Sequence, residues 1–399
     1  MAGPTATRRI GNDERRARLA LRHHLAPEAR ANDAVEVARD LVALHATSAA
    51  AVYLAAWART LDGGADVPAV ERALYEERSL VRMLGMRRTV FVVPVELAPV
   101  VHAAATQALV PGERKRLVQL LEEGGITKDG NRWLRRVQEA TVLALAARGE
   151  ATASELSEDV PELRVQIPVF QDRKWGGQVG VSTRVLFLLA AEGRIVRGRP
   201  RGSWLSTQYR WAPAETWLRG GMAELPVDAA RAELVRCWLR AFGPGTQNDL
   251  KWWTGWTVAE VRRAVAAAGA VEVELEEGTG LALAGDLEPA AAPGPWAALL
   301  PGLDPTVMGW AQRAWFLSDH GRALFDRSGN AGPTVWWDSR VVGGWGQRND
   351  GQVVFRLLED IGAEGAAEVE RAAARLQAWL GETRVTPAFR TPLERELTA

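Results

Sequence analysis

Arginine side chains gather in two short stretches that each read as two apolar strands around a basic turn. The first is 79–94, SLVRMLGMRRTVFVVP, and the second is 193–212, which contains no acidic residue. Guanidinium groups bind phosphate oxygens, so two basic hairpins predict a nucleic-acid partner rather than only a solvated charged surface. The basic residues expected to contact duplex DNA are Arg82, Arg87, Arg88, Lys174, Arg184, Arg194, Arg197, Arg199, Arg201 and Arg210.

Each basic hairpin directly follows a segment with helical periodicity, which is the order of a winged helix. We expect a first unit at 13–110, whose hairpin follows helices at 13–25, 33–44, 49–59 and 67–75 and precedes a helix at 97–110. Ser48 is expected to cap the helix that starts at 49. A second unit at 111–218 contains helices at 133–147 and 184–192 and the more basic hairpin.

A third unit, expected at 219–287, repeats the order of helices and hairpin with the opposite charge. Helices are predicted at 229–242, 246–253 and 258–268, with Thr246 and Thr257 as caps of the last two. The hairpin that follows carries Glu272, Glu274, Glu276 and Glu277. These carboxylates would repel phosphate, so we expect this hairpin to serve the architecture rather than to contact DNA.

The remainder of the chain follows a Pro- and Ala-rich linker at 288–295 and has a different pattern. Strands are expected at 333–337, 340–345 and 352–358, followed by a helix at 364–380. We therefore predict an α+β fold of tandem winged-helix units, with a β-rich C-terminal domain at 296–399.

Composition excludes several classes of protein. Lys plus Arg and Asp plus Glu both number 49, so the chain is not a nonspecific polycation. The single cysteine, Cys237, excludes an intramolecular disulfide and a multi-cysteine metal site, and its apolar neighbours predict a core position. No apolar run is long enough for a bilayer, and the N-terminal residues are polar, so we expect no signal peptide and a cytoplasmic location. Many of the 17 tryptophans are expected in the core.

Six stretches along the chain carry a resemblance to a known family. They are LVALHATSAAAVYLAAWAR, RMLGMRRTVFVVP, DLKWWTGWT, LLPGLDPTVMGW, LFDRSGNAGPTVWWDSRVVGGW and RVTPAFRTPLEREL. Residues 13–397 resemble the winged-helix proteins that include the AlkZ and YcaQ type DNA glycosylases. The resemblance implies a C-shaped clamp on double-stranded, damaged DNA. It also implies a monomer that excises alkylated or interstrand-crosslinked purines, in DNA repair or genotoxin self-resistance, without metal or cofactor.

The resemblance also indicates where the chemistry would lie. The family's glycosylases carry Gln, an apolar residue and then Gln or Asp near the end of an early helix, and this chain has His45, Ala46 and Thr47 there. Hydrolysis of the N-glycosidic bond builds positive charge on the sugar, which a polar group can stabilise while orienting water. Histidine can position or deprotonate water near neutral pH, and the Thr47 hydroxyl can hydrogen-bond it. His45 and Thr47 are therefore the candidate catalytic residues.

Other interpretations of these residues remain open from the sequence alone. His45 can interact with the last carbonyls of a helix, Thr47 and Ser48 can cap the next helix, and Asp40 can orient His45 or face solvent. Asp304 is expected to form an Asx-turn before Pro305 rather than to act in catalysis. Because both motif positions differ from the family's, a non-catalytic DNA-binding or regulatory protein is the alternative to a glycosylase.

Overall fold

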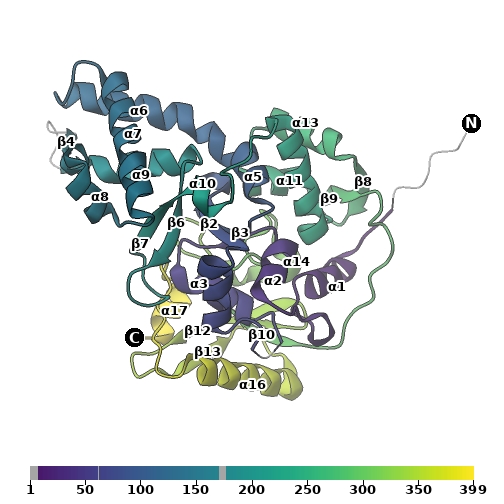
Figure 1. The fold of residues 1–399 in the computed structure, drawn as a ribbon. Coiled ribbons are helices and arrows are strands. Elements are labelled where there is room, and N and C mark those ends of the chain that lie inside the picture. The colour runs from purple at the N-terminus through teal and green to yellow at the C-terminus, as the bar shows by residue number, and fades with distance from the viewer. Residues whose placement is uncertain (1–7, 62, 170–176) are drawn as a thin grey trace, which may run out of the picture.

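A five-stranded antiparallel sheet lies at the centre of the computed structural model, which describes residues 8–61, 63–169 and 177–399 (Figure 1). Its strands occur in the order β1-β3-β2-β6-β7. Their bounds are Leu44–His45 (β1), Leu80–Leu84 (β2), Val90–Pro94 (β3), Ile195–Pro200 (β6) and Tyr209–Pro213 (β7). Both predicted basic hairpins are therefore present, as β2–β3 and β6–β7.

The two basic hairpins are neighbours in this one sheet. Strands β2 and β6 are antiparallel, with Arg82 opposite Arg197. The hairpins expected in the first and second winged-helix units are thus hydrogen-bonded to each other, although the sequence places them more than 100 residues apart. The boundaries of the predicted units remain predictions.

Helices of the N-terminal region surround the central sheet, and one of them differs from the expectation. The bounds are Asn12–Arg22 (α1), Ala34–Asp40 (α2), Ala49–Trp57 (α3), Val67–Glu71 (α4) and Ala98–Val101 (α5), with π-helical turns at Arg72–Glu76 and His102–Thr106. Helix α2 ends at Asp40 rather than at residue 44. Val42 then adopts a positive φ of 66°, and Leu44 and His45 pair with Val92 and Phe91 of β3. This long-range pairing overrides the local helical preference.

A helical lobe forms one end of the molecule (Figure 1, upper left). Its elements are Val110–Glu123 (α6), Gly130–Arg148 (α7), Ala153–Asp159 (α8), Gln166–Val169 (β4), Gly177–Gly180 (β5) and Val181–Ala191 (α9). Leu121, Leu134 and Leu189 are among its wholly buried core residues. The sequence interpretation ended the helix before this lobe at residue 110 and missed α6, which continues to Glu123.

The acidic hairpin lies on the other side of the molecule (Figure 1, right). The elements there are Val227–Phe242 (α11), Gln247–Thr254 (α12), Val258–Ala268 (α13), Ala270–Leu275 (β8) and Gly278–Leu283 (β9), whereas the short helix Ala214–Trp217 (α10) lies beside β6 and β7. Thr246 and Thr257 form the expected caps, each within a capping box. Glu276 accepts hydrogen bonds from Asn12, and Glu277 forms an ion pair with Arg15. The acidic hairpin therefore binds the basic helix α1 of its own chain.

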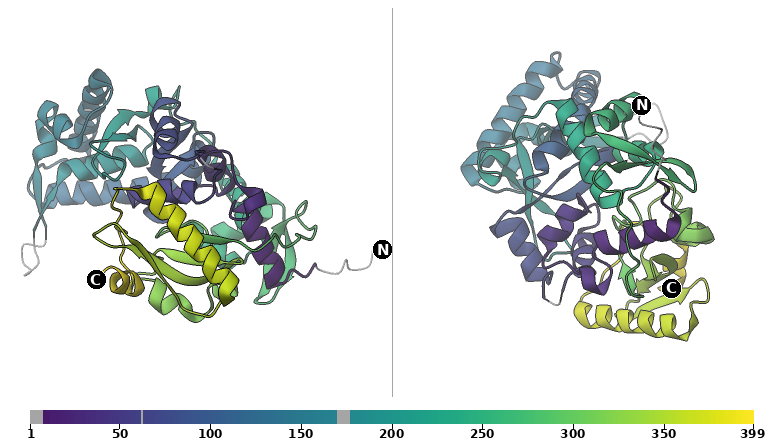
Figure 2. Two further views of the ribbon diagram at one scale, coloured as in Figure 1. Left: turned by 90° about the horizontal axis from the view of Figure 1, so that it is seen from below. Right: turned by 90° about the vertical axis from the view of Figure 1, so that its right-hand side faces the viewer.

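The C-terminal region contains the expected sheet and one strand that the sequence did not reveal. The sheet order is β10-β11-β12-β13, with bounds Ala297–Leu300, Thr334–Trp337, Arg340–Gln347 and Val353–Leu357. The helices are Ala314–Leu317 (α14), Gly321–Leu324 (α15), Gly362–Leu380 (α16) and Pro392–Leu397 (α17). Helix α16 lies along this sheet (Figure 2). Helices and strands thus occur together, which confirms the α+β class.

One large apolar core connects the N- and C-terminal regions. Trp238, Trp310 and Trp336 are wholly buried in it, which confirms a core role for many of the tryptophans. Arg59 and Asp304 cross this core as an ion pair, with 2.6 Å between Nη2 and Oδ1, and both side chains are 0% exposed. Asp304 also accepts the backbone N–H of Thr306, which is the predicted Asx-turn. Nowhere in the described ranges is a helix both long and apolar enough to span a membrane.

Candidate functional site

His45 lies on the edge strand β1 rather than at a helix end. Its side chain is 6% exposed, and its ring centroid is 5.0 Å from that of Phe91 on β3. The backbone N–H of Thr47 lies 3.5 Å from Nδ1 of His45, the outer limit of a hydrogen bond. The expectation that His45 interacts with the last carbonyls of a helix is therefore wrong.

The imidazole of His45 is held in its neutral form. Burial, together with the nearby positive charge of Arg87, lowers the pKa of His45 from 6.5 to about 4. At neutral pH the ring can donate or accept a hydrogen bond without adding a positive charge to the site.

The backbone of Ala46 is bonded on both sides, which holds the segment 45–47 in place. Its N–H donates to the carbonyl oxygen of Val90 at 2.8 Å, and its carbonyl oxygen accepts a hydrogen bond from Nη1 of Arg82 at 3.1 Å. Arg82 is 1% exposed and lies over the ring of Tyr209, 4.7 Å from the centroid. The expectation that Arg82 contacts DNA is corrected, because its guanidinium is enclosed by protein.

Thr47 and Ser48 lead from β1 into helix α3. Thr47 is exposed. Ser48 occupies the N-cap position, but its side chain forms no capping hydrogen bond, contrary to the expectation. Asp40 does not orient His45 either, because its carboxylate binds Nε2 of His24 at 2.8 Å.

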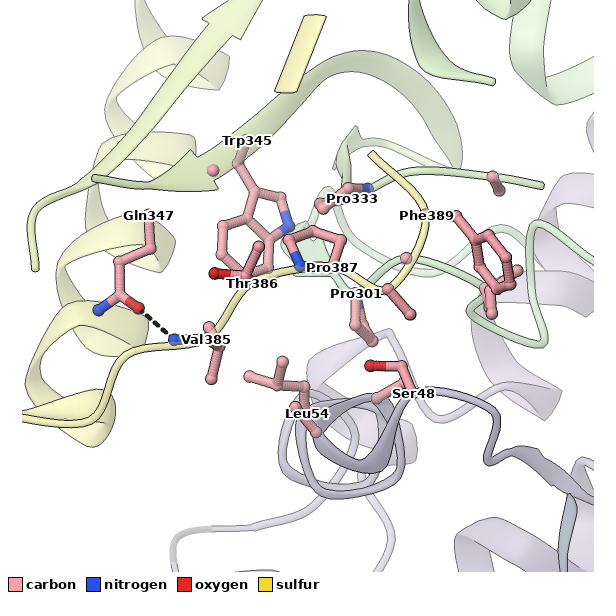
Figure 3. Close-up of a pocket in the computed structure, with 17 residues that line it drawn as sticks. Ser48, Leu54, Pro301, Pro333, Trp345, Gln347, Val385, Thr386, Pro387 and Phe389 are labelled. Carbon is pink, nitrogen blue, oxygen red and sulfur yellow. Dashed lines mark hydrogen bonds between the residues drawn. The ribbon is translucent and has the colours of Figure 1, made fainter. Parts of the chain in front are cut away.

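An apolar pocket adjoins the start of helix α3 (Figure 3). Ser48 and Leu54 line one side of it, and Trp345, Pro387 and Phe389 line the other. The described residues that line this pocket include no ionisable side chain. The described lining therefore supplies no acid or base of its own.

Arg87 is the basic hairpin residue whose charge affects His45. It lies in the turn between β2 and β3 with a φ of 52°, and its guanidinium carbon is 4.1 Å from the ring centroid of Trp252 on α12. Arg313 lies over the same ring, with its guanidinium carbon 4.5 Å from the centroid. The sequence interpretation missed Trp252 and Arg313, although Trp252 lies in one of the family-like stretches, DLKWWTGWT.

The other arginines predicted to contact DNA differ in how far they are neutralised. Four of them form ion pairs within the chain: Arg88 with Glu113, Arg194 with Glu139, Arg199 with Glu71 and Glu76, and Arg210 with Glu155. Arg201 is exposed, whereas Arg184 and Arg197 are half-buried, and none of the three has an ion-pair partner within the described ranges. Lys174 lies outside the described residues.

A group of metal-ligating side chains occurs at His24, Glu36 and Asp40. Both ring nitrogens of His24 are already bonded, Nδ1 to the carbonyl oxygen of Ala29 at 2.7 Å and Nε2 to Asp40. Glu36 accepts the backbone and side-chain amides of Asn32. Because both ring nitrogens of His24 are occupied, local hydrogen bonds account for this group.

The comparisons with known proteins agree with this architecture. A family model described as "DNA glycosylase AlkZ-like" matches residues 38–379, which is most of the chain. The chain therefore belongs to the AlkZ-like DNA glycosylases, a family of DNA-repair hydrolases. The solved structure of the DNA glycosylase AlkZ from Streptomyces sahachiroi is similar, with a TM-score of 0.71 at 21% identity. That match covers 95% of this chain and 99% of the other, whereas no curated protein sequence matches.

Proposed function

We propose that this glycosylase excises alkylated or interstrand-crosslinked purines from duplex DNA as a monofunctional enzyme, with His45 and Thr47 at the reacting nucleoside. The observation that carries the proposal is the buried, neutral imidazole of His45 on a segment whose backbone is bonded on both sides. Tandem winged helices clamped on DNA, a monomeric state and a cytoplasmic, nucleoid-associated location belong to the same proposal.

A neutral imidazole suits hydrolysis of an N-glycosidic bond. Positive charge develops on the sugar as the bond to the base breaks, and a protonated histidine would oppose that charge. His45 stays neutral because of its burial, so it can orient water or the leaving base without that penalty. The exposed hydroxyl of Thr47 can hold the same water. A purine alkylated at N7 leaves more readily because it is already cationic, so a site without a carboxylate suffices.

Phosphate contacts are assigned to arginines of helix α9 and of the second basic hairpin that remain available. Arg201 is exposed, and Arg184 and Arg197 keep their charge without an ion pair in the described parts of the chain. Arg88, Arg194, Arg199 and Arg210 would have to exchange carboxylate partners for phosphates. We expect the former group to contribute more to DNA affinity.

The test is base release from duplex DNA that carries N7-alkylguanine or an N7-linked crosslink, with wild type and His45→Ala compared side by side. We expect release by wild type and a loss of at least about 100-fold in the variant, because general acid–base groups contribute about that much. DNA affinity should survive the substitution. Equal release by both proteins would move the chemistry away from His45, and tight binding without release by either would favour a non-catalytic DNA-binding protein.

A further inference from the structure

Two arginines that are far apart in the sequence pack against one tryptophan beside the candidate site. The guanidinium carbons of Arg87 and Arg313 lie 4.1 Å and 4.5 Å from the ring centroid of Trp252. Trp252 is half-buried, so part of the indole remains open to solvent. The cluster lies close enough to His45 for the charge of Arg87 to lower the pKa of its imidazole.

Each arginine lies beside a backbone segment from elsewhere in the chain. At Gly255, which ends helix α12 with a φ of 78°, an added Cβ would lie 3.4 Å from Cγ of Arg87, so this backbone passes close to the arginine. Nε of Arg313 donates to the carbonyl oxygen of Val307 at 2.9 Å. Remote segments of the chain thus bring two positive charges together.

The two charges lack a carboxylate partner. Neither Arg87 nor Arg313 forms an ion pair with any acidic residue in the described ranges, and Nε of Arg87 and Nη2 of Arg313 are buried without an acceptor. Asp249 is the carboxylate whose charge acts on Arg313. Its oxygens already accept the N–H groups of Ala311 and Gln312 and the hydroxyl of Thr246. Burial, assisted by the charge of Arg87, lowers the pKa of Arg313 to about 10.

We propose that Arg87 and Arg313 form a binding site for one backbone phosphate of the DNA strand next to the nucleoside at His45. This inference rests on the proposed function. A phosphodiester supplies the negative charge that the two adjacent guanidinium groups lack within the described ranges, and its oxygens accept hydrogen bonds from the guanidinium N–H groups that remain accessible. It would also neutralise Arg87, whose charge otherwise opposes the positive charge that develops on the sugar. Binding of the DNA phosphate would therefore also favour breakage of the N-glycosidic bond.

Stability measurements distinguish this site from a purely structural cluster. Arg313→Met removes a buried charge from beside Arg87 but also the donor to the Val307 carbonyl, so its Tm without anions serves as the baseline for the anion response. Inorganic phosphate, compared with chloride at equal ionic strength, should raise the Tm of wild type more than that of Arg313→Met. Arg371→Met on helix α16, which removes an exposed arginine paired with Glu368, is the matched control and should respond like wild type. If phosphate raised the Tm of all three proteins by the same amount, the proposed phosphate site would be wrong.

DNA binding provides the second measurement. Arg313→Met and Arg87→Met should each lower affinity for damaged and undamaged duplex by a similar factor and reduce the slope of log K against log salt by up to about one, because both arginines bind one phosphate. Arg313→Lys, which keeps the charge but loses the planar fork, should recover the slope in part and replaces Arg313→Met if that variant does not fold. Unchanged slopes would overturn the phosphate site while the proposed glycosylase stands. If wild-type protein bound no DNA, the proposed function would fail, and the phosphate measurement would still decide whether the anion site exists.

Discussion

Arg82 donates a hydrogen bond of 3.1 Å to the backbone carbonyl oxygen of Ala46, the residue between His45 and Thr47. Arg82 belongs to β2, so this bond links β2 to the candidate catalytic segment. The strand between them, β3, holds the same segment through the bond from the Ala46 N–H to the Val90 carbonyl oxygen. An arginine that the sequence assigns to phosphate contact is thus a positioning residue for the segment 45–47.

Replacing Arg82 should therefore affect base release more than DNA binding. We expect Arg82→Met to reduce kcat by about 10-fold or more, because segment 45–47 loses the bond that fixes it. Leaving the buried carbonyl of Ala46 without a donor should also cost roughly 1–3 kcal/mol of unfolding free energy. Single-turnover base release and DNA titrations measure the two effects separately. A variant with weaker DNA binding and an unchanged rate would contradict the positioning role.

The neutral state of His45 predicts a flat pH profile for base release. Because the pKa of His45 is lowered from 6.5 to about 4, its imidazole stays neutral at every pH above about 5. The rate should be nearly constant from about pH 5 to pH 8 and should fall as the pH approaches 4. Subtracting release by His45→Ala at each pH removes spontaneous depurination. A fall in rate centred near pH 6.5 would mean that the imidazole titrates as it does in water.

The lowered pKa of His45 also makes the free energy of unfolding depend on pH. Between about pH 6.5 and 4 the unfolded chain binds a proton at His45 that the folded protein does not, so stability falls as the pH falls through this range. A shift of this size corresponds to roughly 3 kcal/mol when complete. Urea unfolding of wild type and His45→Gln at several pH values isolates this contribution from that of the carboxylates. If the free energy of unfolding changed with pH in the same way in both proteins, burial would not lower the pKa of His45.

The ion pair between Arg59 and Asp304 predicts a large loss of stability on removal of one partner. Both side chains are 0% exposed, so Asp304→Ala leaves a buried positive charge without compensation and should cost about 3–5 kcal/mol. Asp13→Ala is the control, because the Asp13 side chain in its pair with Arg16 is 98% exposed and should contribute almost nothing. Chemical unfolding compares the variants. A similar small effect at both positions would show that the core tolerates the unpaired arginine.

Arg201 and Arg199 of the second basic hairpin should contribute unequally to DNA binding. Arg201 is exposed, whereas Arg199 is neutralised by Glu71 and Glu76. We expect Arg201→Ala to reduce the salt slope of binding by about one and Arg199→Ala to reduce it less. Binding titrations between 50 and 200 mM salt, roughly the range over which such contacts weaken, measure both slopes. Equal reductions would indicate that Arg199 exchanges its carboxylates for phosphate on binding.

Sequence reasoning succeeds where neighbouring residues determine the outcome. The capping boxes at Thr246 and Thr257, the two basic hairpins and the acidic hairpin β8–β9 all depend on side chains a few positions apart. It fails at residues 41–45, where helical periodicity continues but pairing with β3 makes a strand. It also missed β10, whose partner β11 lies more than 30 residues away.

The sequence by itself determined the class of the fold, the family-like stretches and the position of His45 and Thr47 in the chain. Only the tertiary structure decided that Arg82 is buried beneath Ala46, that His45 is neutral and that Arg87 and Arg313 share Trp252. The reason is physical: charge state and availability for binding depend on burial and on partners from remote segments, and the free energies involved arise only when those segments pack together.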